Sequence, residues 1–243
     1  GLGAALRLAP DDELMRGNVD VLAFRARARG LDVSVEAFGI GEGSIAGADI
    51  VVIGNGPLSA MRSVLTDLGE RREALASHID ADGVVLAVGG GAELLGTGVS
   101  VHDGADVTGL GLLPFRAIRT RQRKVGYLVA DTDLGRLIAF EDHASSWEPT
   151  EAAASWGAVT AGVGSSPNAR EGIRVRNAVA TTAQGPLLPL NPEIADGLLS
   201  AALARQGASL APAAELAVID GYAGGARQKI DSLHTKTFNA IQL

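Results

Sequence analysis

The chain has 243 residues, of which 47% are hydrophobic and 20% are charged, and its formal net charge is −7. These values fit one large globular α/β domain, and the negative charge argues against a broad nucleic-acid-binding surface. The chain contains no cysteine, so disulfides, thiolate metal ligands and thiol catalysis are excluded, and a cytoplasmic location is expected. No apolar run approaches the roughly 20 residues of a membrane span.

The first half of the chain alternates helical and strand patterns. Segment 19–30 has apolar residues at helical spacing, with Gly17 and Asn18 as the predicted turn and N-cap and Gly30 as the predicted C-cap. Alternation over residues 32–38 predicts a strand. Apolar runs predict buried strands at 48–57 and 83–88, and helical patterns cover 61–80 and begin again at 92–95.

The second half reads as shorter strands followed by helices. The basic run 116–124 is expected to form a solvated strand or loop edge. A helix is expected over 193–205, and the tail 212–243 is expected to be partly helical with a break at 221–225. Strand patterns are expected at 111–118, 124–130, 136–143 and 173–181, with a glycine-rich hairpin over 155–172.

This order predicts an α/β fold. We expect one three-layer domain with a central, mostly parallel sheet over residues 1–210, and a C-terminal helical extension over residues 211–243. No internal repeat and no linker separates further domains.

Three consecutive glycines, Gly89 to Gly91, join the apolar run at 83–88 to a helix start. Such a turn can be a phosphate-binding loop, a close-packing device or a nucleophile elbow. The G-x-G-x-x-G pattern is broken at Leu94 and no G-K-[ST] motif is present, so no nucleotide cofactor is expected. Packing and the elbow stay open as readings of the turn.

Several motifs resemble those of class I glutamine amidotransferases of the CobB/CobQ type. "VLAVGGGAELLG" (85–96) resembles their nucleophile elbow, with Gly89 where they have a cysteine. "AQGPLLPLNP" (183–192) resembles their L-H-G-P-L-L-P-x-N-P signature, with Gln184 where they have a histidine. The resemblance also covers "DIVVIGNGP" (49–57), "VTGLGLLPF" (107–115), "RKVG" (123–126) and "IAFEDHAS" (138–145), and it is nearest to the glutaminase subunit (GatD) of lipid II isoglutaminyl synthase.

The resemblance implies an amidotransferase fold with a degenerate site. Glutamine hydrolysis needs a nucleophile, a proton-transferring base and oxyanion donors. Gly89 and Gln184 are then vestigial nucleophile and base positions, so no catalytic residue is expected and glutamine hydrolysis is predicted to be absent. The oxyanion loop also departs from the family, with Asn55 and Pro57 where glycine and glutamine are usual.

Substrate-binding roles are carried over to Gly56, Gly90, Arg123 and His143. For Arg123, a solvated edge position is an equal alternative to a carboxylate contact. His78, His102, His143 and His234 share no metal-ligand spacing, so no metal site and no cofactor are expected.

The family relationship further implies a partner. The resembling glutaminase subunits pair with an ATP-dependent, MurT-like Mur ligase in modifying peptidoglycan precursors, so a non-catalytic scaffolding or regulatory subunit of a heterodimer is expected. One alternative is an enzyme repurposed around His143 and Ser145. Another is a binding module for glutamine or a related amino acid that uses Arg123 with backbone donors near Gly56 and Gly90.

Overall fold

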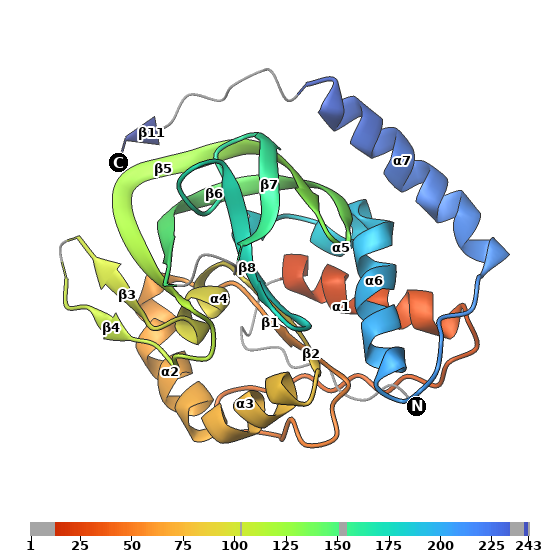
Figure 1. Ribbon diagram of the computed structural model, residues 1–243, viewed down its shortest axis with the longest axis horizontal. Helices are drawn as coiled ribbons and strands as arrows, with labels where there is room; N and C mark the ends of the chain where they lie inside the picture. Colours follow the sequence, from red (N-terminus) through yellow and green to blue (C-terminus); the bar gives the residue numbers. More distant parts are fainter. Residues whose placement is uncertain (1–12, 103, 151–154, 234–240, 243) are drawn as a thin grey trace.

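The computed structural model describes residues 13–102, 104–150, 155–233 and 241–242, and shows a curled sheet with helices on both faces (Figure 1). The helices are α1 (Glu13–Arg27), α2 (Met61–Glu70), α3 (Arg72–Asp80), α4 (Gly89–Leu95), α5 (Leu187–Leu190), α6 (Pro192–Ala204) and α7 (Ala217–Asp231), with short 3-10 turns η1 (Leu58–Ala60) and η2 (Ala214–Leu216). The strands are β1 (Ile50–Ile53), β2 (Val84–Val88), β3 (Gly98–Val101), β4 (Val107–Thr108), β5 (Phe115–Thr132), β6 (Gly135–Pro149), β7 (Ser155–Ala161), β8 (Arg170–Val175), β9 (Ala178–Thr181), β10 (Ala183–Gln184) and β11 (Ile241–Gln242).

The centre of the sheet is parallel and its flank is antiparallel. Strand β2 lies between β1 and β9 and runs parallel to both, and β3 runs parallel to β5. From β9 the sheet continues through β8, β7 and β5 in antiparallel pairs. Strands β1, β2 and β9 are buried along their whole length, as expected for parallel strands with both faces covered. The expected α/β architecture is confirmed.

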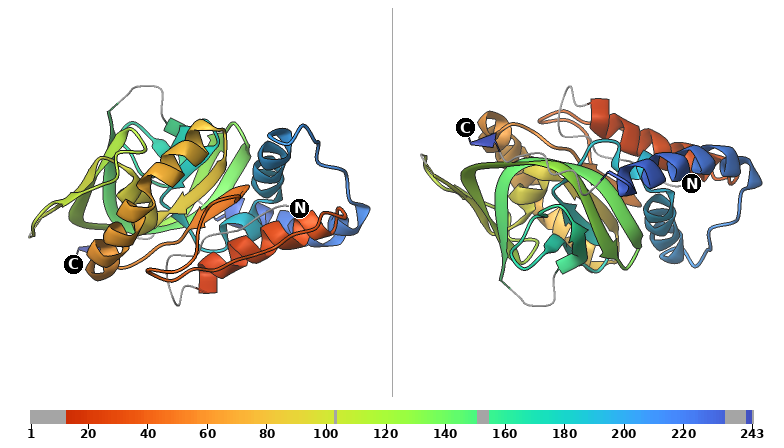
Figure 2. Two further views of the ribbon diagram at one scale, coloured as in Figure 1. Left: turned by 90° about the horizontal axis from the view of Figure 1, so that it is seen from below. Right: turned by 90° about the horizontal axis from the view of Figure 1, so that it is seen from above.

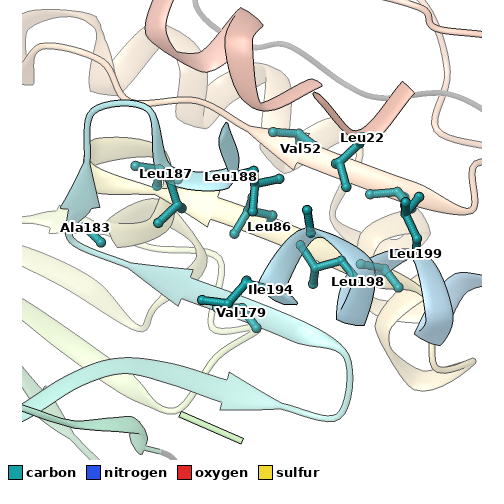
Figure 3. Packing of buried hydrophobic residues seen from close by; sticks show 14 of the residues in the cluster. Leu22, Val52, Leu86, Val179, Ala183, Leu187, Leu188, Ile194, Leu198 and Leu199 are labelled. Atoms are coloured by element: carbon teal, nitrogen blue, oxygen red, sulfur yellow. The ribbon is translucent and has the colours of Figure 1, made fainter. Parts of the chain in front are cut away.

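Two apolar clusters make the three layers. Because side chains alternate along a strand, Ile50 and Val52 of β1 face one cluster while Val51 and Ile53 face the other. Helices α1, α5 and α6 cover the first face (Figure 3), and α2, α3 and α4 cover the second. The labelled side chains of Figure 3 that join helices to strands in the first cluster include Leu22, Val52, Leu86, Val179 and Leu198.

Strands β5 and β6 form one long curved pair (Figure 2). The expectation of separate strands at 111–118 and 124–130 is wrong, because residues 115–118 and 124–130 lie in the single strand β5 and residues 111–114 precede it. The register with β6 shifts between Arg119 and Lys124, and such an irregularity bends a strand and increases its local twist. The bend lets β5 pair with β3 at its start and with β7 at its end.

Near the N-terminus, the expected cap is wrong and so is the first strand. Helix α1 begins at Glu13, so Gly17 and Asn18 lie inside it. The Asn18 side chain is buried and accepts a hydrogen bond from Leu188 N. Residues 32–38 form no regular strand, and 43% of Val35 is exposed. Gly30 does end the helix, with φ +73° and its N–H bonded to Arg27 O.

Three further expectations are corrected. The helical stretch 61–80 is two helices, which meet at Arg71. The strand expected over 173–181 is two strands joined by a tight turn at Arg176, whose φ is +53°. The break expected at 221–225 does not occur, since α7 runs through these glycines. By contrast, the strands at β1 and β2, the hairpin of β7 and β8, and the helix at α6 are confirmed.

Helix α7 is tied to the rest of the chain by side-chain contacts. Arg25 of α1 binds Asp220 and Asp196, and Arg227 donates hydrogen bonds to Asn191 and to Arg136 O. The division at residue 210 into a domain and an extension stays a prediction. Among the residues that the structure describes, no helix is long and apolar enough to cross a membrane.

Candidate functional site

The three glycines lie at the end of β2, where α4 begins. Gly89 has φ +55°, a left-handed conformation that costs an L-residue with a side chain about 1–2 kcal/mol. A strained strand-to-helix turn of this kind is what exposes the nucleophile in elbow-type hydrolases. The backbone of an elbow is therefore present, and its first residue carries no side chain.

The loop after β1 lies directly against this turn. A Cβ atom added at Gly91 would lie 2.2 Å from Gly54 O, and one added at Gly90 would lie 2.6 Å from Gly56 O. At Gly89 it would lie 2.3 Å from Asn55 Oδ1. Real Cβ atoms essentially never come this close, so close packing is a second reason for the glycines. The turn therefore has both the backbone of an elbow and the close packing that the sequence left open as alternatives.

Asn55 joins the loop to the elbow by a hydrogen bond. Its Oδ1 accepts from Gly90 N at 2.8 Å. Gly90 follows Gly89, and in elbow-type enzymes the N–H of the residue after the nucleophile is an oxyanion donor. Gly56 and Gly90, both expected to bind substrate, line a small pocket beside the elbow together with Pro57, Met61 and Leu94.

Gln184, predicted from its motif to be a vestigial base position, lies at the same edge of the sheet. Strand β9 pairs in parallel with β2, with Thr181 opposite Val88, so Gly89 and Gln184 follow the carboxyl ends of neighbouring strands. The Gln184 side chain donates from Nε2 to Asp142 O at 3.0 Å. A carboxamide neither gains nor loses a proton near neutral pH, so the Gln184 side chain cannot act as a general base.

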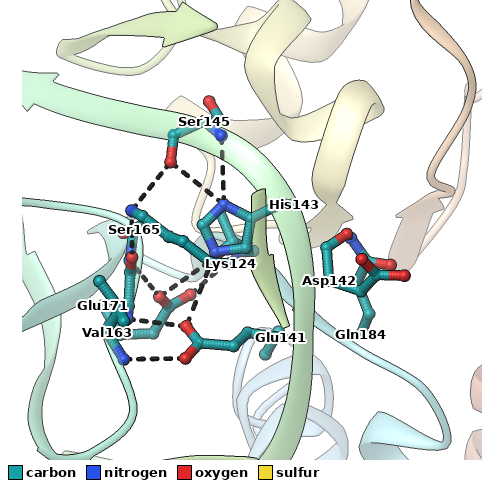
Figure 4. Close-up of polar contacts among 12 residues, drawn as sticks. Lys124, Glu141, Asp142, His143, Ser145, Val163, Ser165, Glu171 and Gln184 are labelled. Carbon is teal, nitrogen blue, oxygen red and sulfur yellow. Dashed lines mark hydrogen bonds and ion pairs between the residues drawn. The ribbon is translucent and has the colours of Figure 1, made fainter. Parts of the chain in front are cut away.

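Arg123 and His143 are not brought together. Arg123 Nε donates to Asp142 Oδ1 at 2.5 Å. Asp142 and His143 are neighbours on β6, and their side chains leave opposite faces of the strand (Figure 4). Arg123 therefore contacts the Gln184 side of β6, while His143 lies on the other side.

His143 belongs to a buried polar cluster inside the curled sheet, which we call the inner cluster: Lys124, Glu141, His143, Ser145, Ser165 and Glu171 (Figure 4). His143 is 7% exposed, its Nδ1 lies 3.1 Å from Ser145 O, and its Nε2 lies 3.8 Å from Glu141 Oε2. Lys124 Nζ donates to Ser145 O and Gly164 O, both at 3.0 Å, and burial lowers the pKa of this lysine.

Two carboxylates of the inner cluster hold the loop between β7 and β8. Glu141 accepts from Val163 N and Gly164 N, one on each oxygen. Glu171 accepts from Ser165 N on one oxygen and Thr182 N on the other. A carboxylate that accepts several hydrogen bonds is stabilised in its charged form. The cluster thus holds the backbone of the loop in place, and it encloses the His143 side chain.

The cluster makes stability depend on pH. Burial alone would raise the pKa of Glu141, but the nearby His143 and the hydrogen bonds from Gly164 N and Val163 N hold it below the usual value. A carboxyl with a lowered folded-state pKa stabilises the fold above its unfolded-state pKa and loses that contribution as pH falls through the folded-state value. The loss therefore falls below about pH 5.

Glu141→Gln should remove this dependence. We expect the free energy of unfolding at pH 7 to fall by about 1–3 kcal/mol, since the amide nitrogen would face one of the two backbone N–H groups. Urea titrations at pH 7 and pH 4 should show a smaller difference for the variant than for the wild type. The exposed Glu148→Gln is the control, and an unchanged pH dependence in Glu141→Gln would contradict the assignment.

The basic run 116–124 is less solvated than expected. Lys124 is held by two carbonyl groups, and Arg119 pairs at 2.7 Å with Glu93, which is 2% exposed. Arg116 pairs with Asp106 at the surface. These basic side chains find partners on both faces of β5, so the number of basic residues in the run does not indicate how exposed they are.

The "GPLLPLNP" signature has a structural role. Asn191 is fully buried, and its side chain accepts from Ile138 N and donates to Ile138 O and Leu187 O. Asn18 accepts from Leu188 N in the same segment. These bonds position α5 and the start of α6 against β6 and α1, so the motif serves the fold.

No group of three or more His, Asp or Glu side chains suited to a metal ion occurs in the described part of the chain. His78 is 9% exposed and its Nε2 lies 3.1 Å from Val84 O, and burial lowers its pKa. Asp11, Asp12 and His234 lie outside the described residues.

A mixed sheet covered on both faces, with a strand-to-helix elbow at the end of β2, is the fold of class I glutamine amidotransferases. A solved structure described as a glutamine amidotransferase shares it, with a TM-score of 0.58 and 13% identity over 83% of this chain and 99% of its own. Residues 13–191 match the CobB/CobQ-like glutamine amidotransferase domain, and the chain belongs to this family.

Two curated relatives are similar over most of their length. The chain is 31% identical over 199 residues to the lipid II isoglutaminyl synthase (glutamine-hydrolyzing) subunit GatD of Staphylococcus aureus strain N315, covering 81% of each protein. It is 27% identical over 195 residues to the subunit of the same name from Streptococcus pneumoniae strain ATCC BAA-255 / R6, covering 78% of this chain and 75% of that protein. The family inferred from the motifs and the resemblance to GatD are confirmed.

Proposed function

We propose that this protein is a GatD-like subunit that does not hydrolyse glutamine and serves as the non-catalytic partner of a MurT-like, ATP-dependent Mur ligase in peptidoglycan precursor modification. One observation carries the proposal: the elbow keeps its strained backbone at Gly89, φ +55°, yet presents no side chain to attack an amide. Nucleophilic catalysis requires such a group and a base beside it.

The base position gives independent support. Gln184 lies at the same edge of the sheet, and its side-chain amide donates a hydrogen bond to Asp142 O. Since neither partner of a nucleophile–base pair is present, restoring one alone would leave the other missing. The family fold is meanwhile intact, from the buried strands to the "GPLLPLNP" anchor at Asn191, which is what a subunit kept for its surface would need.

A repurposed enzyme or an amino-acid-binding module built on Arg123 and His143 has less support. The two side chains lie on opposite sides of β6, and His143 is enclosed within the inner cluster. A shared pocket for both residues would require β6 to be rearranged.

The test uses the full chain together with the Mur-ligase-like protein encoded in the same genome. Co-purification should give a stable complex, and ammonia release from L-glutamine should equal the background with or without the ligase and ATP. The amidation of the ligase's substrate should then depend on added ammonium. The S. aureus GatD protein, assayed with its own partner, is the positive control. Glutamine-dependent ammonia release, or the lack of any complex with the ligase, would overturn the proposal.

A further inference from the structure

We propose that Asn55 closes the former glutamine site with its own carboxamide, so that glutamine is excluded as a ligand as well as a substrate. The inference rests on the proposed function only in taking the Gly89 elbow as the former glutaminase site. It concerns binding, which the loss of a nucleophile and a base does not by itself abolish.

The position of the Asn55 oxygen carries the inference. Oδ1 lies 2.8 Å from Gly90 N, and oxyanion donors lie about 2.7–3.1 Å from the oxygen that they stabilise. Asparagine ends in the same CH2–CO–NH2 group as glutamine. The side chain therefore offers the donor the same acceptor that the substrate amide would offer, from within the chain.

The missing side chain at Gly89 is what makes this arrangement possible. A Cβ there would lie 2.3 Å from Asn55 Oδ1 and 2.7 Å from its Cγ. A cysteine or serine at this position and the observed Asn55 conformation therefore exclude each other. The loss of the nucleophile and the inward Asn55 side chain fit together as one change of the site.

The neighbouring loop places a carbonyl group against Gly90. Gly56 O is the atom nearest to a Cβ built on Gly90, at 2.6 Å, and Gly56 N is farther away, at 3.5 Å. The pocket next to the elbow is lined largely by apolar groups such as Met61 and Leu94. A ligand amide would meet a carbonyl and the Asn55 side chain where it needs donors.

A structural role for the same bond makes a different prediction. The first N–H groups of a helix have no partner within the helix, and α4 has no side-chain cap from its own N-cap residue, Val88. Asn55 thus also caps α4. A cap alone would affect the exchange of the Gly90 amide hydrogen and leave glutamine binding unchanged, whereas a plug affects both.

The experiment follows the Gly90 amide by 1H–15N NMR on the full chain, in Asn55→Gly and in Asn55→Asp. Addition of L-glutamine to about 10 mM, roughly tenfold above a millimolar Kd, should leave the wild-type Gly90 signal in place. In Asn55→Gly the Gly90 amide should exchange about tenfold faster, and glutamine should shift its signal saturably. Asn55→Asp keeps an acceptor at this position and should behave as the wild type does.

Two results would overturn the plug. One is a saturable shift of the wild-type Gly90 signal by glutamine, and the other is an Asn55→Gly protein that folds and still fails to bind it. If Asn55→Gly does not fold, Asn55→Ala removes the same carboxamide and is judged by the same two readouts. The proposed function is judged separately, by ammonia release and ligase association in the wild type.

Discussion

Gly91→Ala is expected to lower the free energy of unfolding by about 3 kcal/mol. The added methyl group would lie 2.2 Å from Gly54 O and 2.7 Å from Ile53 Cγ2. Gly54 O is backbone, and Ile53 is fully buried at the end of β1, so neither can move aside without shifting the strand. Urea unfolding followed by circular dichroism measures the change.

The matched control is the same substitution at a position with open space. Gly221 lies inside α7, is exposed, and has no atom within 4 Å of a built Cβ. There alanine should raise the free energy of unfolding by about 1 kcal/mol, because it favours the helix over glycine. Equal effects of Gly91→Ala and Gly221→Ala would show that helix propensity, and not the contact with the β1 loop, decides the outcome at the elbow.

Opposite changes in the free energy of unfolding for Gly91→Ala and Gly221→Ala would explain why three consecutive glycines occupy this elbow. Each of the three positions faces a different residue of the Gly54–Gly56 loop within 2.6 Å of a built Cβ. At Gly89 the contact is the movable tip of Asn55, while at Gly90 and Gly91 it is backbone. The packing constraint is therefore stronger at Gly90 and Gly91 than at Gly89.

The central sheet could be predicted from sequence because its strands are covered on both faces. Continuous apolar runs such as Val84–Val88 follow directly from such burial. The alternation at 32–38 failed for the converse reason, since a period of two reports a local pattern and says nothing about a neighbouring strand to pair with. The continuity of strand β5 was not predicted, because its middle consists of the polar residues 120–123, which lie within the register shift.

The site could be predicted only as far as motifs reach. Gly89 and Gln184 stand in recognisable sequence contexts, and the fold brings them to one edge of the sheet. The Asn55 contact with Gly90 spans 35 positions of the sequence, so no local pattern announces it. Glu171 gave no signal either, because a single glutamate in a glycine-rich segment of the sequence resembles any surface residue until its partners are known.

Glu171 should be the most sensitive charged position in the inner cluster. It is fully buried, and Oε1 accepts from Thr181 Oγ1 and Thr182 N while Oε2 accepts from Ser165 N and Thr182 Oγ1. Glu171→Ala leaves these donors without an acceptor, and we expect a loss of about 3–5 kcal/mol in the free energy of unfolding. Glu148→Ala, at an exposed position of β6, should change it by less than about 0.5 kcal/mol.

Glu171→Gln separates charge and hydrogen bonding from shape. Hydroxyl groups can turn to accept a hydrogen bond, but the N–H groups of Ser165 and Thr182 cannot. These two donors bind different oxygens of Glu171, so either orientation of a glutamine amide places its NH2 group against one of them. Urea unfolding should therefore show Glu171→Gln well below the wild type despite its equal size. A glutamine variant as stable as the wild type would mean that the carboxylate fills space, and that the loop between β7 and β8 is held by other contacts.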